Sequence, residues 1–327
     1  MLSILGAGSF GVALAAVVSR ALEHRSLKSK KIFLWARRPE RCHGWETSFG
    51  DRFPDVCVTH DLPFVLKHTS AVIYAMPAQV LRDFTVNSLK GVMDSTLPFL
   101  IASKGIEKET GLLLHEVLSD VGLQNPLAFL SGPHLAKELT ALKPSPTIGV
   151  LGGARFATSF FQQTLSSEKF ILEITENITA VALAAAFKNV MAVCSGLMRG
   201  EGVLQNTQSA ILAKGIALMD ELTVLFGGTC SASQFPALLG DYMLTTHSQD
   251  SRNTSAGVLL GEGRTLNDLA TAPLAEGTWA MRALQKTLLN RKKRVVFIDA
   301  LCARIFEQKS MDWCALLKSG FEVNNHC

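Results

Sequence analysis

The sequence predicts an α/β fold, with an N-terminal Rossmann-type doubly wound sheet followed by an all-helical C-terminal domain. Three observations predict it. A glycine-rich turn follows a short apolar run at Leu2–Leu5. Further short apolar runs then alternate with helix-like segments such as Thr110–Val121, as in a parallel sheet covered on both faces. From Asn177 onward these runs give way to helical periodicity. The predicted domains are therefore 1–176, for dinucleotide binding, and 177–327, for substrate binding and catalysis.

The composition is that of a globular protein that buries a large core. The chain has 327 residues, enough for two domains, and is 48% apolar and 18% charged. Its formal net charge of +4 is too small to indicate nucleic acid as a partner, although it suits anionic substrates. The seven cysteines are odd in number and form no CxxC pair, which favours reduced thiols. We therefore expect a cytoplasmic protein.

Metal sites and membrane spans are not expected. No group of cysteines or histidines has the spacing of zinc ligands. The longest apolar stretch, around Asn177–Gly200, is interrupted by Lys188 and falls short of the roughly 18 uncharged residues of a span.

The residues Gly6-Ala7-Gly8-Ser9-Phe10-Gly11 form a GxGxxG motif between a predicted strand and a predicted helix, Val12–Leu22. In dinucleotide-binding folds the first glycine permits a tight turn, and the second lets the backbone approach a pyrophosphate. The third lets helix and strand pack closely, and the helix N-terminus attracts the phosphates. The alternative is a glycine turn that merely opens an α/β domain.

The end of the next predicted strand, Lys31–Trp35, bears on the choice of cofactor. An NAD-selective site would have an acidic residue here for the ribose hydroxyls, but the chain reads Ala36-Arg37-Arg38. Two arginines suit the 2′-phosphate of NADP, although Glu40 could still bind a hydroxyl. The expected cofactor is therefore NADP or NAD, and ordinary surface arginines are the alternative.

Later buried strands bring two more candidate segments to the sheet edge where ligands bind. The predicted strands are Ala71–Ala75, Pro98–Ala102, Leu127–Leu130, Thr147–Leu151 and Lys169–Ile174. Ligands of such sheets bind at the carboxyl ends of the strands. Lys104 and the turn Ser131–His134 both follow strands, so we expect them at that edge, although a lysine there can also be a plain surface residue.

Lys188 is the one charge in the middle of the apolar helix Asn177–Gly200. Burial disfavours the ammonium form and brings the pKa of a lysine toward neutrality, and a second cation such as Lys104 would lower it further. A lysine of that kind can move the proton that carbonyl reduction needs at the oxygen. The alternative is a lysine whose stem lies on the core and whose head reaches water.

Ser251-Arg252-Asn253 combines a hydroxyl, a guanidinium and an amide in one short turn, which suits a phosphate. The alternative is an ordinary capped helix start with a surface arginine. Upstream, Asp241 could accept substrate hydroxyls or hold a lysine.

Together these motifs resemble the bacterial-type NAD(P)-dependent glycerol-3-phosphate dehydrogenases. The resembling segments, in family order, are GAGSFG at 6–11, SKGIE at 103–107, SGPHLAKE at 131–138, FKNV at 187–190, GEGVLQN at 200–206, GD at 240–241, SRN at 251–253 and EG at 276–277. The resemblance implies a Rossmann domain and a helical substrate domain. It also implies reversible reduction of dihydroxyacetone phosphate to sn-glycerol 3-phosphate, which feeds phospholipid synthesis.

The resemblance also implies roles for individual residues, with Lys188 as the proton donor and acceptor. The implied substrate contacts are Lys104, Gly132, His134, Lys188, Asp241, Ser251, Arg252 and Asn253. The implied cofactor contacts are Gly6, Gly8, Ser9, Phe10, Gly11, Arg37, Arg38, Lys104, Ala136, Arg252 and Glu276. A homodimer is one alternative for the oligomeric state, which the sequence leaves open.

The sequence departs from the family pattern at several positions. Phe10 stands where Trp or Tyr is usual, His134 replaces a small hydroxyl residue, and Lys214 stands where Arg is usual. Two other functions therefore stay open. One is a related two-domain NADP-dependent reductase of another small carbonyl substrate, and the other is a diverged cofactor-binding sensor without catalysis.

Overall fold

The computed structural model describes residues 1–24, 31–40, 42, 45, 49–248, 251–269 and 276–325. The chain divides into two compact units. The first contains Met1–Ser103 and Leu114–Val181, and the second contains Lys104–Leu113 and Ala182–Cys327. The domain division at 176/177 stays a prediction, and the compact units differ from it in the segments 104–113 and 177–181.

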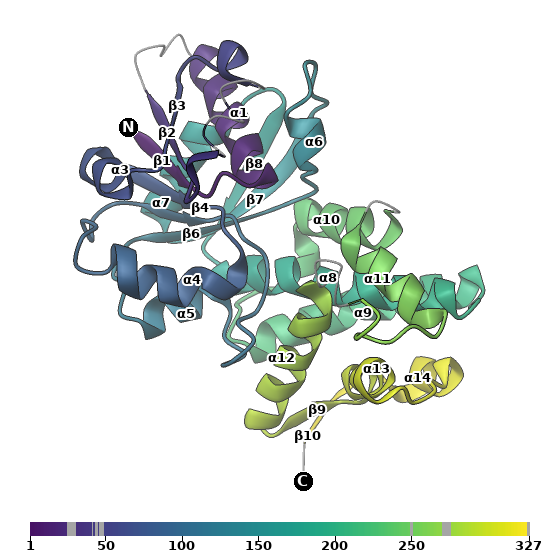
Figure 1. Ribbon diagram of the computed structural model, residues 1–327. Helices are drawn as coiled ribbons and strands as arrows, with labels where there is room; N and C mark the ends of the chain where they lie inside the picture. Colours follow the sequence, from purple (N-terminus) through teal and green to yellow (C-terminus); the bar gives the residue numbers. More distant parts are fainter. Residues whose placement is uncertain are drawn as a thin grey trace. The chain divides into compact units, whose positions relative to one another are not determined.

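The first unit is built on an eight-stranded sheet with the order β3-β2-β1-β4-β5-β6-β7-β8 (Figure 1). The strands are β1 (Leu2–Leu5), β2 (Ile32–Trp35), β3 (Val56–Thr59), β4 (Ala71–Tyr74), β5 (Phe99–Ile101), β6 (Leu127–Ser131), β7 (Thr147–Gly153) and β8 (Phe170–Thr175). Every neighbouring pair is parallel except β6 and β7, which are antiparallel. The predicted Rossmann-type sheet is confirmed.

The antiparallel pairing of β7 is a departure from an all-parallel sheet. A parallel crossover usually needs a full helix between the strands. Here the connection contains only the short helix α6 (Ala136–Leu139), which packs against α1 (Ser9–His24). Arg20 of α1 fixes the end of α6 by donating to Leu139 O at 2.5 Å and Ala141 O at 2.8 Å. The chain therefore returns into the sheet in the opposite direction.

Helices cover both faces of the sheet, which explains the continuous apolar runs of its strands. One group comprises α1, α6 and α7 (Arg155–Leu165). The other comprises α3 (Leu62–His68), α4 (Leu81–Phe84) and α5 (Leu114–Asp120). Short turns of 3₁₀ or π helix lie at η1 (Gly50–Arg52), η2 (Ala78–Val80) and η3 (Thr85–Leu89).

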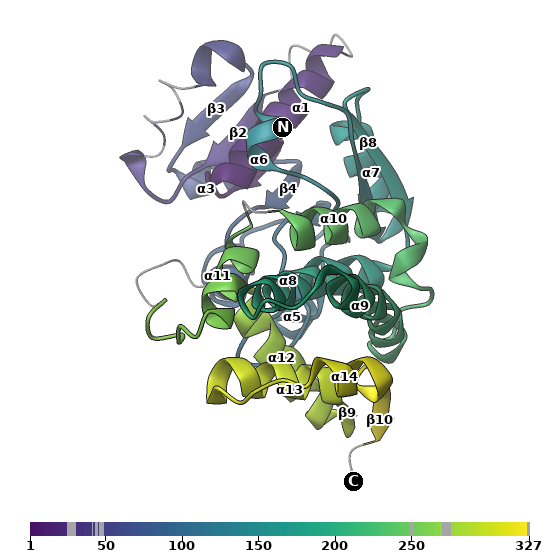
Figure 2. The same cartoon turned by 90° about the vertical axis from the view of Figure 1, so that its right-hand side faces the viewer.

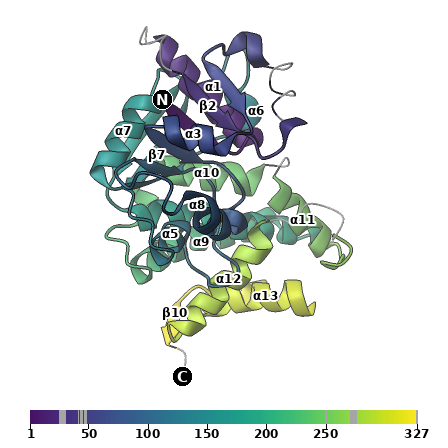
Figure 3. The same cartoon turned by 60° about the vertical axis from the view of Figure 1, so that its left-hand side comes forward.

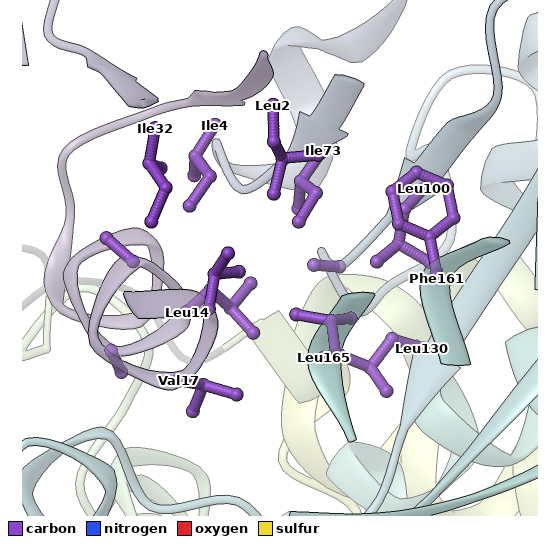
Figure 4. Close-up of a cluster of buried hydrophobic side chains, with 14 of the residues drawn as sticks. Leu2, Ile4, Leu14, Val17, Ile32, Ile73, Leu100, Leu130, Phe161 and Leu165 are labelled. Atoms are coloured by element: carbon purple, nitrogen blue, oxygen red, sulfur yellow. The ribbon is translucent and has the colours of Figure 1, made fainter. Parts of the chain in front are cut away.

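Alternate residues of the fully buried strands β1, β2 and β4 face different helices. Figure 4 shows Ile4, Ile32 and Ile73, from three neighbouring strands, on the side of the sheet where Leu14 of α1 lies. Their neighbours in sequence point to the other face, because side chains alternate along a strand.

Aromatic rings mark that second face. The ring of Phe33 lies 5.5 Å from that of Phe64 in α3, and the ring of Trp35 lies 5.4 Å from that of Phe84 in α4.

The second unit is mainly helical, as predicted. Its helices are α8 (Ile178–Gly200, whose first residues belong to the first unit), α9 (Gln205–Leu225), η4 (Ala232–Gln234), α10 (Pro236–His247), α11 (Arg252–Gly261), α12 (Glu276–Asn290), α13 (Val296–Glu307) and α14 (Trp313–Ser319). A two-stranded antiparallel ribbon, β9 (Lys293–Val295) with β10 (Val323–Asn325), adds to this helical architecture. The ribbon packs beside α12 and α13, as Figures 2 and 3 both show. Strands of three residues are too short to show an alternating pattern in the sequence.

Within this unit α8 and α11 cross at very close range. A Cβ atom on Gly196 would lie 2.0 Å from Thr254 O, and one on Gly257 would lie 2.1 Å from Val193 O. Only glycine fits at these positions, and the close crossing brings the start of α11 to the middle of α8.

Among the described residues, α8 is the one helix long and apolar enough to cross a membrane. Its most apolar window is 89% buried inside the protein, as expected of a core helix. The absence of a membrane span stays a prediction. The six described cysteines are free thiols, and Cys327 lies outside the described residues.

Candidate active site

The glycine motif of the first unit forms the turn between β1 and α1. Gly6 has φ +117°, a region that favours glycine, and a Cβ there would lie 2.7 Å from Met76 Cγ. A Cβ on Gly11 would lie 1.8 Å from Gly6 O, so the helix could not pack against the turn. By contrast, a Cβ on Gly8 would meet no atom within 4 Å. The motif therefore combines two sterically required glycines with one exposed stretch of backbone.

A cavity of about 570 Å³ opens over this turn, entirely within the first unit. Its lining includes Gly6, Gly8, Arg37 and Arg38, together with Met76 and Pro77 after β4. It therefore lies at the carboxyl ends of β1, β2 and β4, where doubly wound sheets bind nucleotides. The exposed backbone of Gly8 fits a pyrophosphate, and the two exposed arginines supply positive charge.

The other residues predicted to contact the cofactor from this unit do not line the cavity. Ser9 and Phe10 open α1, and Ala136 opens α6. The ring of Phe10 stacks on His134, with the ring centroids 6.4 Å apart. Their cofactor contacts stay predictions.

His134 is packed into the first unit. Its Nε2 lies 2.9 Å from Ile148 O, and its ring lies 4.8 Å from that of Phe170. Gly132, with φ +149°, leaves room for this imidazole, because a Cβ there would lie 2.7 Å from His134 Cε1. The predicted substrate contacts of Gly132 and His134 are not tested by this packing and stay predictions.

Three charged side chains meet in the second unit. The carboxylate of Asp241 accepts from Lys188 Nζ through Oδ1 at 2.5 Å and from Lys104 Nζ through Oδ2 at 2.6 Å. The side chains are 3%, 10% and 15% exposed for Asp241, Lys188 and Lys104, respectively. One buried carboxylate is thus shared by two ammonium groups. We call Lys104, Lys188 and Asp241 the lysine–aspartate cluster.

Three separate parts of the chain build this cluster, and Lys104 lies at the start of the segment 104–113. Lys188 is in the buried middle of α8, and Asp241 is on α10. Thr245 lies one turn beyond Asp241, so both side chains point the same way. Its Oγ1 accepts from Lys188 Nζ at 2.9 Å and donates to Asp241 O at 2.7 Å. The head of Lys188 therefore ends on a carboxylate and a hydroxyl instead of in bulk water.

Burial lowers the pKa of Lys188 to about 8; the neighbouring Asp241 raises it in part, and Lys104 lowers it further. Burial alone would raise the pKa of Asp241, but the two lysines hold it well below the usual carboxyl range. Near neutral pH, Asp241 is therefore ionised, while Lys188 has access to both its charged and its neutral form.

The serine–arginine–asparagine turn starts α11. Ser251 is the N-cap, and its hydroxyl accepts from Thr254 N at 3.3 Å. Asn253 donates to Asn189 Oδ1 at 3.0 Å and accepts from Gly277 N at 2.9 Å. Asn253 thus connects the residue after Lys188 to the start of α12.

Two charged residues stand exposed at helix starts near these hydrogen bonds. Arg252 is the first residue of α11, and Glu276 is the first of α12. No group of three or more His, Cys, Asp or Glu side chains is arranged to hold a metal ion in the described part of the chain.

Family models match both parts of the chain. Residues 1–151 match the N-terminal model of NAD-dependent glycerol-3-phosphate dehydrogenase, and residues 177–315 match its C-terminal model. The glycerol-3-phosphate dehydrogenase [NAD(P)+] of Acidobacterium capsulatum is 33% identical over 82% of this chain and 81% of its own length. The chain belongs to the NAD-dependent glycerol-3-phosphate dehydrogenase family.

Other members of the glycerol-3-phosphate dehydrogenase family match nearly the whole chain. The enzyme of Moorella thermoacetica is 29% identical over 96% of this chain and 93% of its own. The crystal structure of the Coxiella burnetii enzyme covers 97% of both chains with a TM-score of 0.83 at 24% identity. A Plasmodium falciparum structure of the same name gives a TM-score of 0.84 at 20% identity, over 97% of this chain and 94% of its own. At these identities the structures show a shared fold.

Sequence reasoning missed one residue that contacts the lysine–aspartate cluster. Thr245 contacts the Nζ atom of Lys188, yet it belongs to no motif singled out in the sequence. The sequence had been interpreted as a loop at Asp241 and a polar turn from Thr245, whereas both residues lie on α10, where a spacing of four residues puts them on one face.

Proposed function

We propose that the protein is an NAD(P)-dependent sn-glycerol-3-phosphate dehydrogenase that interconverts dihydroxyacetone phosphate and sn-glycerol 3-phosphate. Membership of the family supports this reaction, as do the names of its relatives. The observation that carries the mechanism is the buried lysine–aspartate cluster. It gives the protein a lysine with a pKa near neutrality, held on a fixed carboxylate.

NAD or NADP supplies the hydride chemistry when it is bound. The glycine turn would hold the pyrophosphate through backbone N–H groups, with Gly6, Gly8, Ser9, Phe10 and Gly11 as contacts. Arg37 and Arg38 line the same cavity and suit the 2′-phosphate of NADP. Lys104, Ala136, Arg252 and Glu276 complete the proposed cofactor contacts.

Reduction adds a hydride to the carbonyl carbon and a proton to the carbonyl oxygen, and Lys188 supplies that proton. In the reverse direction, neutral Lys188 accepts the proton of the hydroxyl group. A pKa of about 8 makes both forms accessible near neutral pH, which favours general acid–base catalysis. Asp241 and Thr245 fix the position of Nζ, and Lys104 with Asp241 orients the polar groups of the substrate.

The substrate phosphate is proposed to bind at the start of α11. Arg252 offers an exposed guanidinium, and Ser251 offers a hydroxyl proton, because that hydroxyl only accepts within the helix cap. Asn253 Nδ2 has a second N–H beyond the one given to Asn189. Gly132 and His134 stay proposed contacts of the substrate-side turn.

A substrate comparison tests this function. The purified protein is mixed with NADPH or NADH, and absorbance at the nicotinamide band is followed after addition of dihydroxyacetone phosphate or unphosphorylated dihydroxyacetone. We expect oxidation of the cofactor with the phosphate ester and far slower oxidation without it. Faster oxidation with unphosphorylated dihydroxyacetone would favour the related reductase of another small carbonyl substrate. Cofactor binding without any oxidation would favour the sensor.

The cellular setting follows from the same assignment. We propose a cytoplasmic enzyme whose product feeds phospholipid synthesis, with no nucleic acid or membrane as partner. A homodimer is the assembly we propose. Light scattering after size exclusion at micromolar concentration would measure its mass directly.

A further inference from the structure

A second hollow of about 420 Å³ lies within the second unit, apart from the lysine–aspartate cluster. Lys108 and Glu109 line it from the segment 104–113, and Trp279, Arg282, Lys286 and Asn290 line it from α12. No residue of the cluster is part of its lining. We call it the α12 hollow.

The lining carries three cations and one carboxylate. Lys108 Nζ lies 5.0 Å from the centre of the Trp279 ring, and the Arg282 guanidinium lies 4.6 Å from that of Phe306. The face of an aromatic ring attracts a cation electrostatically. A guanidinium stacked on a ring can still donate hydrogen bonds from the N–H groups at its own edge. The α12 hollow is therefore a pre-positioned basic surface.

The one acidic side chain competes weakly for these cations. Lys108 Nζ is 3.6 Å from the Glu109 carboxylate, and the two side chains are 49% and 80% exposed. Exposed pairs of this kind contribute little, so a dianion can displace the Glu109 carboxylate from Lys108.

The same helix also anchors the segment that carries Lys104. Lys286 Nζ donates to Glu109 O at 2.7 Å, and Thr287 Oγ1 donates to Gly111 O at 3.0 Å. Gly111 has φ +75°, and a Cβ there would lie 1.9 Å from Thr287 Oγ1. The segment therefore begins with Lys104 in the lysine–aspartate cluster and ends clamped on α12 at the hollow.

We propose that the α12 hollow binds a small dianion, either inorganic phosphate or the phosphate group of a phosphomonoester. Lys108, Arg282 and Lys286 hold the anion. Because Lys108 and the anchored Glu109 backbone are on the segment 104–113, the bound anion fixes this segment on α12. The anion thereby restricts the movement of the segment that presents Lys104.

Phosphate binding is measured in a variant whose proposed substrate site is weakened. The full-length Arg252→Gln protein is titrated calorimetrically with inorganic phosphate, with and without the changes Lys108→Gln and Arg282→Gln. We expect Kd to rise at least about tenfold, equal to about 1.4 kcal/mol, when both cations are removed. Lys67→Gln with Lys169→Gln removes the same charge from exposed positions of the first unit and is expected to leave Kd unchanged.

Two further readouts complete the test. Amide hydrogen exchange of residues 104–113 is expected to slow when phosphate binds, and this protection disappears in the Lys108/Arg282 variant. A titration with methyl phosphate distinguishes the two proposed ligands. Tighter binding of methyl phosphate indicates a phosphomonoester, and tighter binding of inorganic phosphate indicates the free anion. Equal Kd values in the two double variants, or binding that leaves the exchange of 104–113 unchanged, would overturn the proposal. Thermal unfolding of each variant checks that it is folded.

Discussion

Replacing Asp241 with asparagine removes the one carboxylate between two buried ammonium groups. Lys188 and Lys104 lie 2.5 and 2.6 Å from its oxygens, and all three side chains are largely buried. Removing one member of a buried ion pair costs about 3–5 kcal/mol, because the partner stays buried and uncompensated. We expect the free energy of unfolding at pH 7 to fall by about 3 kcal/mol.

The loss of unfolding free energy in Asp241→Asn should depend on pH in a defined direction. The pKa of Lys188 in the folded protein, about 8, lies below its ordinary value of 10.5. Between these values the unfolded chain binds more protons, so this group makes the folded protein more stable as the pH rises through that window. Without the Asp241 carboxylate the pKa of Lys188 falls further. The destabilisation should therefore be smaller at pH 9 than at pH 7.

Urea unfolding at pH 7 and pH 9 measures both effects. Asp120→Asn is the matched control, because Asp120 makes a 2.5 Å ion pair with Arg82 in a far more exposed setting. It should cost no more than about 1 kcal/mol at either pH. If Asp241→Asn costs no more than this control, or costs the same at both pH values, the buried-cluster reasoning is wrong.

Three further predictions follow from the same contacts. The rate of sn-glycerol 3-phosphate oxidation should rise with pH through the region of the Lys188 pKa, about 8, since neutral Lys188 accepts the proton; a flat profile between pH 6.5 and 9 would contradict this. Changing Arg37 and Arg38 together to glutamine should raise KM for NADPH and leave KM for NADH within about twofold, because only NADPH carries the 2′-phosphate; equal effects on both cofactors would remove the arginines from this role. Asn253→Ala should destabilise the protein by about 1–3 kcal/mol, since Asn189 Oδ1 loses its donor and Gly277 N its acceptor. An unchanged melting temperature would contradict that last expectation.

Local patterns allowed much of the first unit to be predicted. Short apolar runs located β4 and β5 to within a residue or two, because strands buried on both faces leave no polar positions. The glycine motif predicted its turn because Gly6 has a positive φ there and Gly11 packs directly on Gly6 O within the turn itself. Both signals depend on neighbours in sequence.

The segment 104–113 shows where local patterns failed. A helix was predicted from Thr110, but α5 begins at Leu114. Residues before it form a turn closed by Glu107 N donating to Leu112 O and by the bridge of Ile106 with Leu113. The anchoring of this turn on α12 comes from residues more than 170 positions away, which no window of sequence reveals.

The lysine–aspartate cluster shows the same limit at the site. The sequence identified Lys188 and Asp241 separately and left open whether the lysine reached water. The two residues are 53 positions apart, and Lys104 is 137 positions from Asp241. Their meeting at one carboxylate follows from the packing of α8 and α10 within the second unit, and it was that packing that brought Thr245 to Lys188.

The central claim is that Lys188 moves the proton, and turnover of Lys188→Ala with dihydroxyacetone phosphate and NADPH tests it most directly. We expect kcat to fall by about 10²–10⁴, the usual range for general acid catalysis, with the Kd for NADPH unchanged. Added methylamine should restore part of the rate by entering the space that the side chain leaves. Turnover within a few-fold of the unaltered protein would contradict the assignment.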